Sequence, residues 1–463
     1  MTIHWIDIDT LERKGCCLAV REVSGRHTYD VLAKLMSSIN EEYELTDKTC
    51  FTVTDSGANF LKAFKHFSVE EGAEDSTTAS VDESDDMQFH ELHELLNPPD
   101  LTDDDADDDV IYKLPQHWRC ACHSLNLVAS SDASKLSDTV KRISTQTFAK
   151  LQGLWNKQNR SALAAQKIRT ALGSLLITPG ETRWNSTYDS IAQIDRLLST
   201  PETEAKFDKL CDELDIKRLQ PLQKAFVDEY VQVLQPVSSG LDVLQGEKEV
   251  GLGHLLPTLS VIKEQLNDLL AKNKLSVCGP VVRLLLDGID RRFQLMLTNT
   301  EAQLAAVVHP KFKLDWVVDE HESSRLVNLL KKRMHSVGSS ASTEQPTTSS
   351  EVCGHSTVET SAVPPQQDFF AVLAARRQQA AAGVGFDIDE ELSRYLSDNS
   401  AELTALNSYP HIRKLYLALN TGLPASAAVE RLFSLGGRVF SPLRSKLSSE
   451  HFEKMVFLRS VRF

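Results

Sequence analysis

The 463-residue sequence lacks the features that would mark a membrane-spanning or secreted protein. No window contains the ~18 uninterrupted apolar residues that a membrane helix requires. The first residues, MTIHWIDID, have no basic start, and acidic residues interrupt the apolar run, so we do not expect a signal peptide. The eight cysteines, at positions 16, 17, 50, 120, 122, 211, 278 and 353, follow no regular spacing. In a chain of this length they are expected to be reduced thiols in the cytosol or nucleus.

Basic residues are missing from one stretch. Residues 69–109 contain seventeen Asp or Glu and no Lys or Arg, whereas the formal net charge of the whole chain is −15. The remainder therefore carries about +2, and charge alone neither supports nor excludes nucleic-acid binding. Acidic and Ser/Thr-rich composition predicts that residues 69–113 form a disordered, solvated insertion. Binding of this insertion to a basic partner is the alternative.

The flanking segments alternate between strand and helix patterns. Short β-rich runs at 2–6, 16–20 and 49–53 predict strands, and helical spacing predicts helices at 27–39 and 60–67. An edge strand is expected at 114–120, followed by a helix around 123–128. We therefore expect an α/β layer built from residues 1–68 and 114–136.

The rest of the chain reads as helical. Residues 137–335 predict a large all-helical domain, residues 336–367 a disordered Ser/Thr/Pro-rich linker, and residues 368–463 C-terminal helices. Of the last two helices, the first is expected to be capped by Ser426 and stopped by Gly436-Gly437, and the second to begin near Ser448 or Ser449. Two short amphipathic helices cannot bury their faces on each other alone. They are expected to dock on a larger core, on a second copy of the chain, or on both.

The terminal segment PASAAVERLFSLGGRVFSPLRSKLSSEHFEKMVFLR resembles the C-terminal dimerisation region of hAT-superfamily transposases and of host proteins derived from them. FTVTDSGANFLKAF, RCACHSLNLVAS and TRWNSTYDSIAQI resemble further family segments in the same order. The resemblance implies an α/β ribonuclease H-like fold, here N-terminally truncated and interrupted by the all-α insertion domain, with the dimerisation region at about 400–463. The apolar residues expected to mediate dimerisation are Val429, Leu432, Phe433, Phe440, Phe452, Met455 and Leu458.

The resemblance also implies the positions of catalytic carboxylates. Family members hold two divalent metals with three carboxylates, and Asp55 and Glu430 match the second and third. The strand that carries the first would precede residue 1, and Asp7 and Asp9 follow the second strand instead. We therefore expect a catalytically inactive chain without a cofactor, with Mg or Mn binding only if the site is completed upstream. From the residues alone, Asp55 is an ordinary turn residue and Glu430 a solvated helix carboxylate.

Two further motifs match the family. Cys120 and His123 match its C-x-x-H motif; with His117 nearby a zinc site is conceivable, but no second ligand pair stands at a suitable spacing, so a structural role is favoured and no metal is expected. Arg183 and Trp184 match an R-W pair whose Trp stacks on DNA bases, and a core aromatic is the alternative. No BED-type zinc finger, which family members usually carry, precedes Trp5.

These observations predict a domesticated or truncated transposase-like protein that acts through self-association, as a homodimer or larger assembly, in the nucleus. The alternatives are a nuclear factor that binds DNA nonspecifically, and an active metal-dependent transposase if the true N-terminus is longer. No membrane and no small-molecule substrate is expected. Replacing Leu432 and Phe433 with Asp is expected to convert an assembly into monomers.

Overall fold

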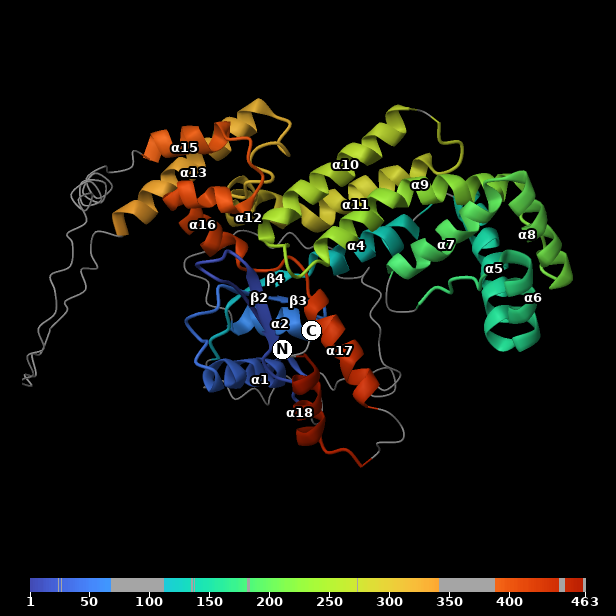
Figure 1. The fold of residues 1–463 in the computed structure, drawn as a ribbon, viewed down its shortest axis with the longest axis horizontal. Coiled ribbons are helices and arrows are strands. Elements are labelled where there is room, and N and C mark those ends of the chain that lie inside the picture. The colour runs from blue at the N-terminus through green and yellow to red at the C-terminus, as the bar shows by residue number, and fades with distance from the viewer. Residues whose placement is uncertain are drawn as a thin grey trace, which may run out of the picture. The chain divides into compact units, whose positions relative to one another are not determined.

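The structure is a computed structural model that describes residues 1–23, 25, 27–67, 112–134, 136, 138–180, 184–272, 274–340, 388–440 and 446–460. Most of the expected acidic insertion, most of the expected linker, and Arg183 lie outside the described residues. The chain divides into two compact units: unit 1 comprises Met1–Ala306 and Leu419–Phe463, and unit 2 comprises Val307–Ala418. Each unit is described by itself, with the element labels of Figure 1.

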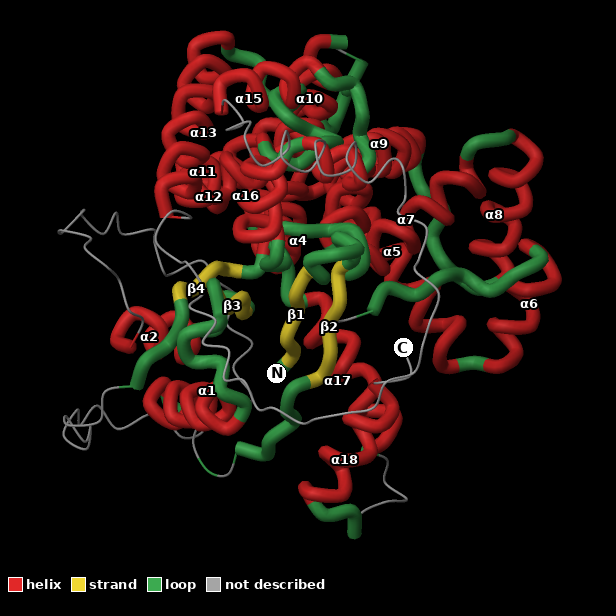
Figure 2. Tube along the Cα trace, turned by 60° about the vertical axis from the view of Figure 1, so that its left-hand side comes forward, coloured by secondary structure: helices red, strands yellow, loops and turns green. Residues whose placement is uncertain are grey.

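All four described strands lie in unit 1 and form two pairs, shown in yellow in Figure 2. β1 (Thr2–Ile6) pairs antiparallel with β2 (Arg13–Cys17), and β3 (Phe51–Thr54) pairs parallel with β4 (Gln116–Arg119). The strand expected at 2–6 is confirmed, but the strand expected at 16–20 is misplaced. Asp7 accepts hydrogen bonds from the backbone and hydroxyl of Thr10, and this turn lets pairing begin at Arg13.

Three helices accompany the strands in chain order: α1 (Tyr29–Glu42), α2 (Ala58–Phe67) and α4 (Ala121–Ser130). α1 and α2 pack through Ala33, Ala63 and Phe64, together with Leu114, which precedes β4. The alternation of strand and helix predicted for these segments is thus present.

The helical expectation for the middle of the chain is confirmed. Its elements in unit 1 are η2 (Asp132–Ser134), α5 (Asp138–Arg160), α6 (Ala162–Leu172), α7 (Trp184–Leu198), α8 (Pro201–Glu213), α9 (Pro221–Leu244), η3 (Leu252–His254), α10 (Leu255–Ala271) and α11 (Gly279–Thr298). One core cluster joins α5 to α9 through fully buried side chains such as Leu154, Ile194 and Phe207.

α12 (Thr300–Val307) leads into unit 2, which contains α13 (Glu320–Ser340), α15 (Ile388–Ser397), η4 (Leu403–Ser408) and most of α16 (Pro410–Asn420). The buried Lys313 Nζ donates to Tyr395 O at 2.8 Å, and the Tyr395 hydroxyl donates to Val307 O at 3.0 Å. These bonds join residues from the expected helical domain to residues from the expected C-terminal region. Unit 2 therefore spans the boundary expected at 335. The linker start expected at 336 is wrong, because α13 continues to Ser340.

The chain ends in α17 (Ala427–Val439) and α18 (Ser449–Ser460), which we call the terminal hairpin. The expected stop at Gly436-Gly437 is wrong. A Cβ on Gly436 would lie only 3.2 Å from the Phe452 ring, so glycine here allows α18 to approach closely, and this packing outweighs the weak helix propensity of glycine. Ser426 precedes α17 as expected, but its side chain makes no capping bond to that helix. Ser448 does cap α18, accepting from His451 N at 3.4 Å.

Within the described residues, no helix combines the length and apolar character needed to cross a membrane.

Candidate functional site

Three segments of unit 1 that are distant in sequence meet beside the carboxyl ends of β3 and β4. Cys120 N donates to Thr54 O at 2.8 Å, and Ala121 N donates to Pro424 O at 2.9 Å. Ser426 N donates to Cys120 Sγ at 3.3 Å. We call this meeting point of residues 54–57, 119–123 and 424–426 the Cys120 corner. It places the segment that starts α17 against the β3–β4 pair.

The sulfur of Cys120 is the centre of the corner. Its side chain is fully buried, and it accepts hydrogen bonds from His123 N at 3.4 Å and from the amide and hydroxyl of Ser426. The Cys122 thiol also donates to it, and this bond, with the Ser426 and His123 donors, outweighs burial and lowers the pKa of Cys120 to about 6. The same bond and burial raise the pKa of Cys122. By accepting from His123 N and Ser426 N, Cys120 Sγ ties α4 to the terminal segment.

These contacts show how Cys120 and His123, the two residues of the predicted structural motif, are connected. Cys120 contacts His123 through the backbone amide of His123, at the first turn of α4. His117 is engaged elsewhere: its Nε2 lies 2.8 Å from Thr54 Oγ1, and its ring stacks on Phe64. Sequence reasoning paired Cys120 with His123 but missed its bonds to Cys122 and Ser426, because Ser426 is 306 positions away.

The two predicted carboxylates belong to segments that adjoin the corner. Asp55 directly follows β3 and accepts from Gly57 N at 3.2 Å, which is the turn role that the residues alone predict. Glu430 lies in the first turn of α17, is exposed, and is close enough to Cys122 to help raise its pKa. The structure thus brings both family positions to one region of unit 1.

The residues present do not fit a two-metal site. Such a site needs hard oxygen ligands from several carboxylates, and of the three family positions Asp55 and Glu430 are the two matched in this sequence. Asp7 is held by Lys14 Nζ at 2.8 Å and by Thr10, and these bonds keep its pKa well below the usual range. Among the described residues, no group of three or more His, Cys, Asp or Glu is placed to hold a metal ion.

Polar contacts hold both helices of the terminal hairpin on unit 1. Arg431 Nε donates to Glu247 Oε1 at 2.6 Å, and Arg431 Nη2 donates to Gln245 O at the end of α9 at 3.0 Å. Glu453 of α18 accepts from Val20 N at 3.2 Å and pairs with Arg21. The hairpin is therefore docked on the chain's own core.

The predicted dimerisation residues fall into two groups. Leu432 is buried and packs with Cys17, Val439 and Val456, and Phe452 and Met455 pack partly buried against the same cluster. Val429 is also partly buried. Leu432 thus belongs to the chain's own core, one of the docking options expected for these helices, because Cys17 of β2 packs against it.

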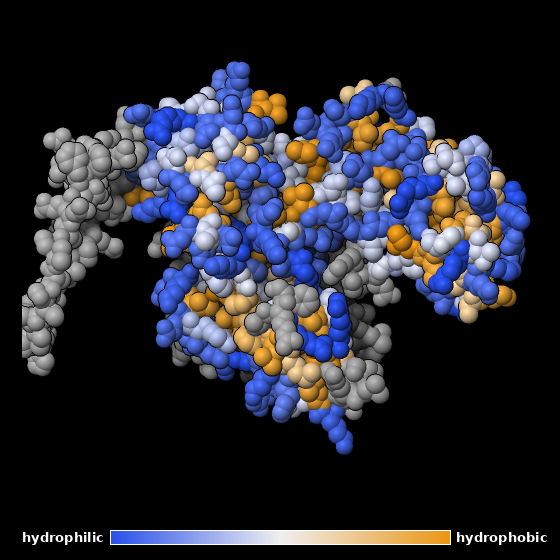
Figure 3. Space-filling view, viewed as in Figure 1, coloured by the Kyte–Doolittle hydropathy of each residue, from blue (hydrophilic) through white to orange (hydrophobic). Residues whose placement is uncertain are grey.

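The other group is exposed and forms what we call the outer apolar residues. Phe433, Phe440 and Leu458 are 71%, 65% and 66% exposed. Phe457, which the sequence reasoning did not single out, is 42% exposed. Phe433 lies in α17, and Phe440 directly follows that helix, where its ring contacts Phe452 edge-on. Figure 3 shows orange apolar atoms at the surface in this part of unit 1.

A second surface is basic. Residues 139–180 contain seven Lys or Arg and no Asp or Glu. All seven basic residues lie in α5 or α6. Lys150 and Lys157 donate to backbone carbonyls of Arg218 and Leu214, and Lys167 donates to Glu213 O. The other four, all exposed, are Lys141, Arg142, Arg160 and Arg169. Among the described residues no ion pair joins this basic surface to a carboxylate.

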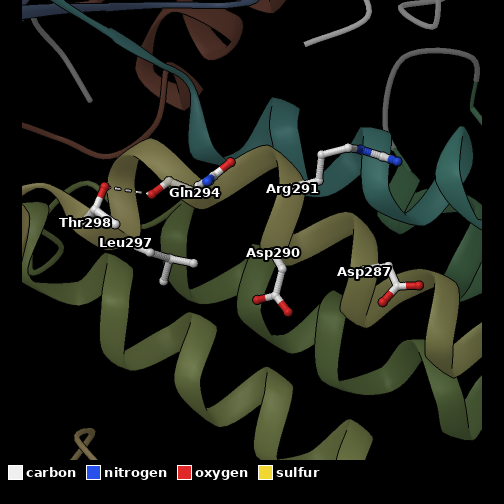
Figure 4. Close-up of a pocket in the computed structure, with 6 residues that line it drawn as sticks. All are labelled: Asp287, Asp290, Arg291, Gln294, Leu297 and Thr298. Carbon is white, nitrogen blue, oxygen red and sulfur yellow. Dashed lines mark hydrogen bonds between the residues drawn. The ribbon is translucent and has the colours of Figure 1, made fainter. Parts of the chain in front are cut away.

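Trp184 is the first residue of α7, and its side chain lies outside the described residues. The hollow drawn in Figure 4 lies along α11 and is lined by Asp287, Asp290, Arg291, Gln294, Leu297 and Thr298. Its charged side chains include Asp290, paired with Lys263, and Arg291, paired with Asp132. Asp290 and Arg291 are therefore already engaged by partners within the chain.

Comparison with known proteins finds distant similarity to transposases. The chain is 20% identical over 484 residues to a putative AC transposase of Zea mays, an alignment that covers 98% of this chain and 54% of that protein. It is 27% identical over 193 residues to a putative AC9 transposase of Zea mays, covering 41% of this chain and 18% of that protein. The chain thus spans about half the length of the first relative and less of the second. No protein-family model matches the chain.

Proposed function

We propose, from this distant similarity to plant transposases, that the protein is transposase-derived and nuclear, and that it acts by associating with a second copy of itself through the terminal hairpin. The ribonuclease H-like fold implied by the family resemblance is part of this proposal, and the parallel β3–β4 pair followed by α4 is consistent with it. The observation that carries the proposal is the exposure of Phe433 in α17 and of Phe440 directly after that helix.

Large exposed aromatic side chains on a well-anchored helix favour a protein partner. Aromatic residues are enriched at interface cores, and burying one apolar side chain contributes about 1.5–3 kcal/mol. The hairpin is fixed by Arg431 and Glu453, so its outer apolar residues are presented on a preorganised surface. A second copy is the favoured occupant, because the family segment that this hairpin resembles is a dimerisation region.

The test of self-association compares exposed apolar residues of the terminal hairpin with a buried one. Phe433→Asp and Leu458→Asp should leave the helical circular dichroism unchanged and reduce the mass measured by sedimentation to that of a monomer. Leu432→Asp should instead lower stability, because Leu432 is buried within the chain. Leu295→Asp is the matched control, since Leu295 is 82% exposed on α11. A wild-type monomer, or an unchanged assembly in Phe433→Asp, would contradict the proposal.

We propose further that these residues do not cleave DNA. Phosphoryl transfer by two metals needs carboxylates that bridge them, and among the described residues no group of three or more His, Cys, Asp or Glu could hold a metal ion. Supercoiled plasmid should remain intact with Mg²⁺ or Mn²⁺. Metal-dependent nicking that Asp55→Ala abolishes would overturn this part of the proposal.

The basic surface of α5 and α6 favours a second candidate function, nonspecific binding of DNA. Exposed cations without carboxylate partners attract phosphates and release counterions, so affinity should fall steeply with salt. Arg160→Glu combined with Arg169→Glu should weaken binding and flatten its salt dependence. Lys206→Glu on α8 is the matched control, because Lys206 pairs with Glu202. Equal binding by all three proteins would remove this candidate.

A further inference from the structure

We propose that residues 69–109 bind, within the same chain, to the surface formed by α5 and α6, and that they compete there with DNA. The binding of this segment is independent of the functions proposed above. Its competition with DNA rests on the second candidate function.

The surface of α5 and α6 offers cations that can take an acidic partner. Among the described residues, no ion pair joins its exposed cations to a carboxylate. These cations are Lys141, Arg142, Arg160 and Arg169. Because residues 139–180 contain no acid, the surface has no carboxylate of its own to neutralise them.

The helix that packs on α6 does not supply the missing acids. α8 shares a core cluster with α6 and carries five carboxylates, but each of them is paired with a Lys or Arg outside α5 and α6. The pairs are Glu202 with Lys206, Glu204 and Asp208 with Lys224, Asp212 with Arg218, and Glu213 with Lys209. The cations of α5 and α6 are therefore left for another partner.

Exposed apolar side chains belong to the same surface. Leu163 of α6 is 65% exposed, and Leu175 and Ile177, which follow that helix, are 37% and 41% exposed. The segment after α6 is fixed, because Leu176 N donates to Gln158 Oε1 at 2.8 Å and Ile177 N donates to a side chain of α7 at 2.6 Å. A surface that combines cations with a fixed apolar patch suits an acidic segment that also carries apolar residues.

Residues 69–109 have this complementary chemistry. They contain seventeen Asp or Glu and no Lys or Arg. Within them Phe89, Leu92 and Leu96 recur at intervals of three and four positions, with acidic residues before, between and after them. This spacing is typical of a segment that binds a partner through one apolar face. Charge and apolar pattern therefore both match the surface of α5 and α6.

The length of the chain permits the contact. The structure describes the chain up to Phe67 and again from Tyr112, and the 44 residues 68–111 lie between them. At about 3.3 Å per residue, a segment of this length can extend about 70 Å and return. Both of its ends are joined to unit 1, which also contains α5 and α6. The effective concentration is then on the order of millimolar, which favours this segment over a separate protein.

Carbodiimide cross-linking tests the contact in the full chain, because this reagent joins a Lys amine to a nearby carboxylate. Peptide mass spectrometry should find residues 69–109 joined to Lys141 and Lys167. The exposed Lys248 and Lys272 of unit 1 lie outside the surface and are the controls. Their cross-links to the segment should be about tenfold rarer.

The same experiment separates one chain from two. In an equal mixture of light and isotopically heavy chains, each cross-link should join peptides of the same label. Cross-links spread evenly over all exposed lysines, or cross-links between light and heavy peptides, would overturn the proposal.

A synthetic, fluorescently labelled peptide of residues 69–109 tests occupancy of the surface. A protein in which a Gly/Ser segment of equal length replaces these residues should bind the peptide, as measured by anisotropy. The wild type should bind it at least about tenfold more weakly, because its own segment occupies the surface. Equal binding by the two proteins, or no binding by the replaced protein, would overturn the proposal.

Substitutions in the replaced protein test where the peptide binds. Leu163→Ser should weaken binding, whereas Leu295→Ser should not, because Leu295 is 82% exposed on α11. Arg160→Glu combined with Arg169→Glu should abolish binding, whereas Lys206→Glu on α8 should change it little. Equal effects of the two Leu→Ser variants, which leave the charge unchanged, would indicate attraction by net charge alone and overturn docking at this surface.

Competition with DNA is measured separately. Unlabelled peptide should displace a labelled duplex from the replaced protein at concentrations near the Kd of the peptide. Binding of both ligands without displacement would overturn the competition. A replaced protein that binds the peptide but no DNA would contradict the second candidate function, and with it the competition, but not the docking of residues 69–109.

Discussion

His117 shows how one half-buried side chain links β3 and β4. Its Nε2 lies 2.8 Å from Thr54 Oγ1 on β3, and its ring stacks on Phe64 of α2 with centroids 4.3 Å apart. Burial lowers the pKa of His117 to about 4, and burial likewise lowers the pKa of His4 on β1 to about 4. Both imidazoles are therefore neutral in the folded protein at neutral pH, and protonating them opposes folding.

The free energy of unfolding should fall as the pH is lowered from about 6.5 to about 4. In this window the unfolded chain binds protons at both histidines and the folded chain does not, so stability is full above the unfolded pKa and declines below it. Urea titrations at a series of pH values measure the decline, and His117→Gln should reduce its slope. An identical slope in the variant would contradict the assignment of part of this decline to His117.

At the scale of elements, helices α9 and α10 touch through a glycine. A Cβ on Gly240 would lie 2.4 Å from Ile262 Cδ1 and 3.2 Å from Thr258 Cγ2. The absence of a side chain lets the two helices approach around the buried Val237 and Leu241. Gly153 in α5 is different, because its nearest neighbour would be Ile216 Cδ1 at an ordinary 3.5 Å.

Gly240→Ala should lower the free energy of unfolding by about 1–3 kcal/mol through overpacking. Gly153→Ala should raise it by up to about 1 kcal/mol, because alanine has the higher helix propensity and meets no clash. Chemical denaturation of both variants measures the difference. A Gly240→Ala protein as stable as Gly153→Ala would show that α10 shifts without cost.

The same elements show what sequence periodicity can predict. Helical spacing found α9, α17 and α18, because each buries one stripe of apolar residues. It ended α17 too early at Gly436, because local propensity does not include the close packing of Phe452. Periodicity also could not distinguish the buried Leu432 from the exposed Phe433. Leu432 is buried by Cys17, which is more than 400 positions away in the sequence. The family resemblance supplied Asp55 and Glu430, and periodicity could not.

For the molecule as a whole, charge is divided unevenly along the chain. Residues 69–109 carry seventeen of the acidic residues, and residues 139–180 carry seven basic residues without an acid. Although the net charge is −15, α5 and α6 therefore carry a basic surface. Electrostatic attraction to a polyanion acts over about 8 Å at physiological salt, so both regions influence any encounter with DNA.

Replacing residues 69–109 with an uncharged Gly/Ser segment of equal length should strengthen binding to DNA, because the net charge changes from −15 to about +2. The gain should be larger at low salt and smaller at high salt. Fluorescence anisotropy with a labelled duplex at several salt concentrations measures it. Affinities that match the wild type at every salt concentration would contradict the prediction.

The docking of α18 on β2 makes the order of synthesis matter. Val20 and Glu453 are hydrogen-bonded although they lie 433 positions apart, and the cluster of Cys17, Leu432 and Val456 has the same long span. At about 5–20 residues per second, a ribosome exposes the β1–β2 pair for tens of seconds before its cover is made. The β1–β2 pair thus depends on helices that are translated long after it. A premature stop codon after position 423 would leave a nascent protein with an uncovered apolar face beside β2, a substrate for chaperones and proteases.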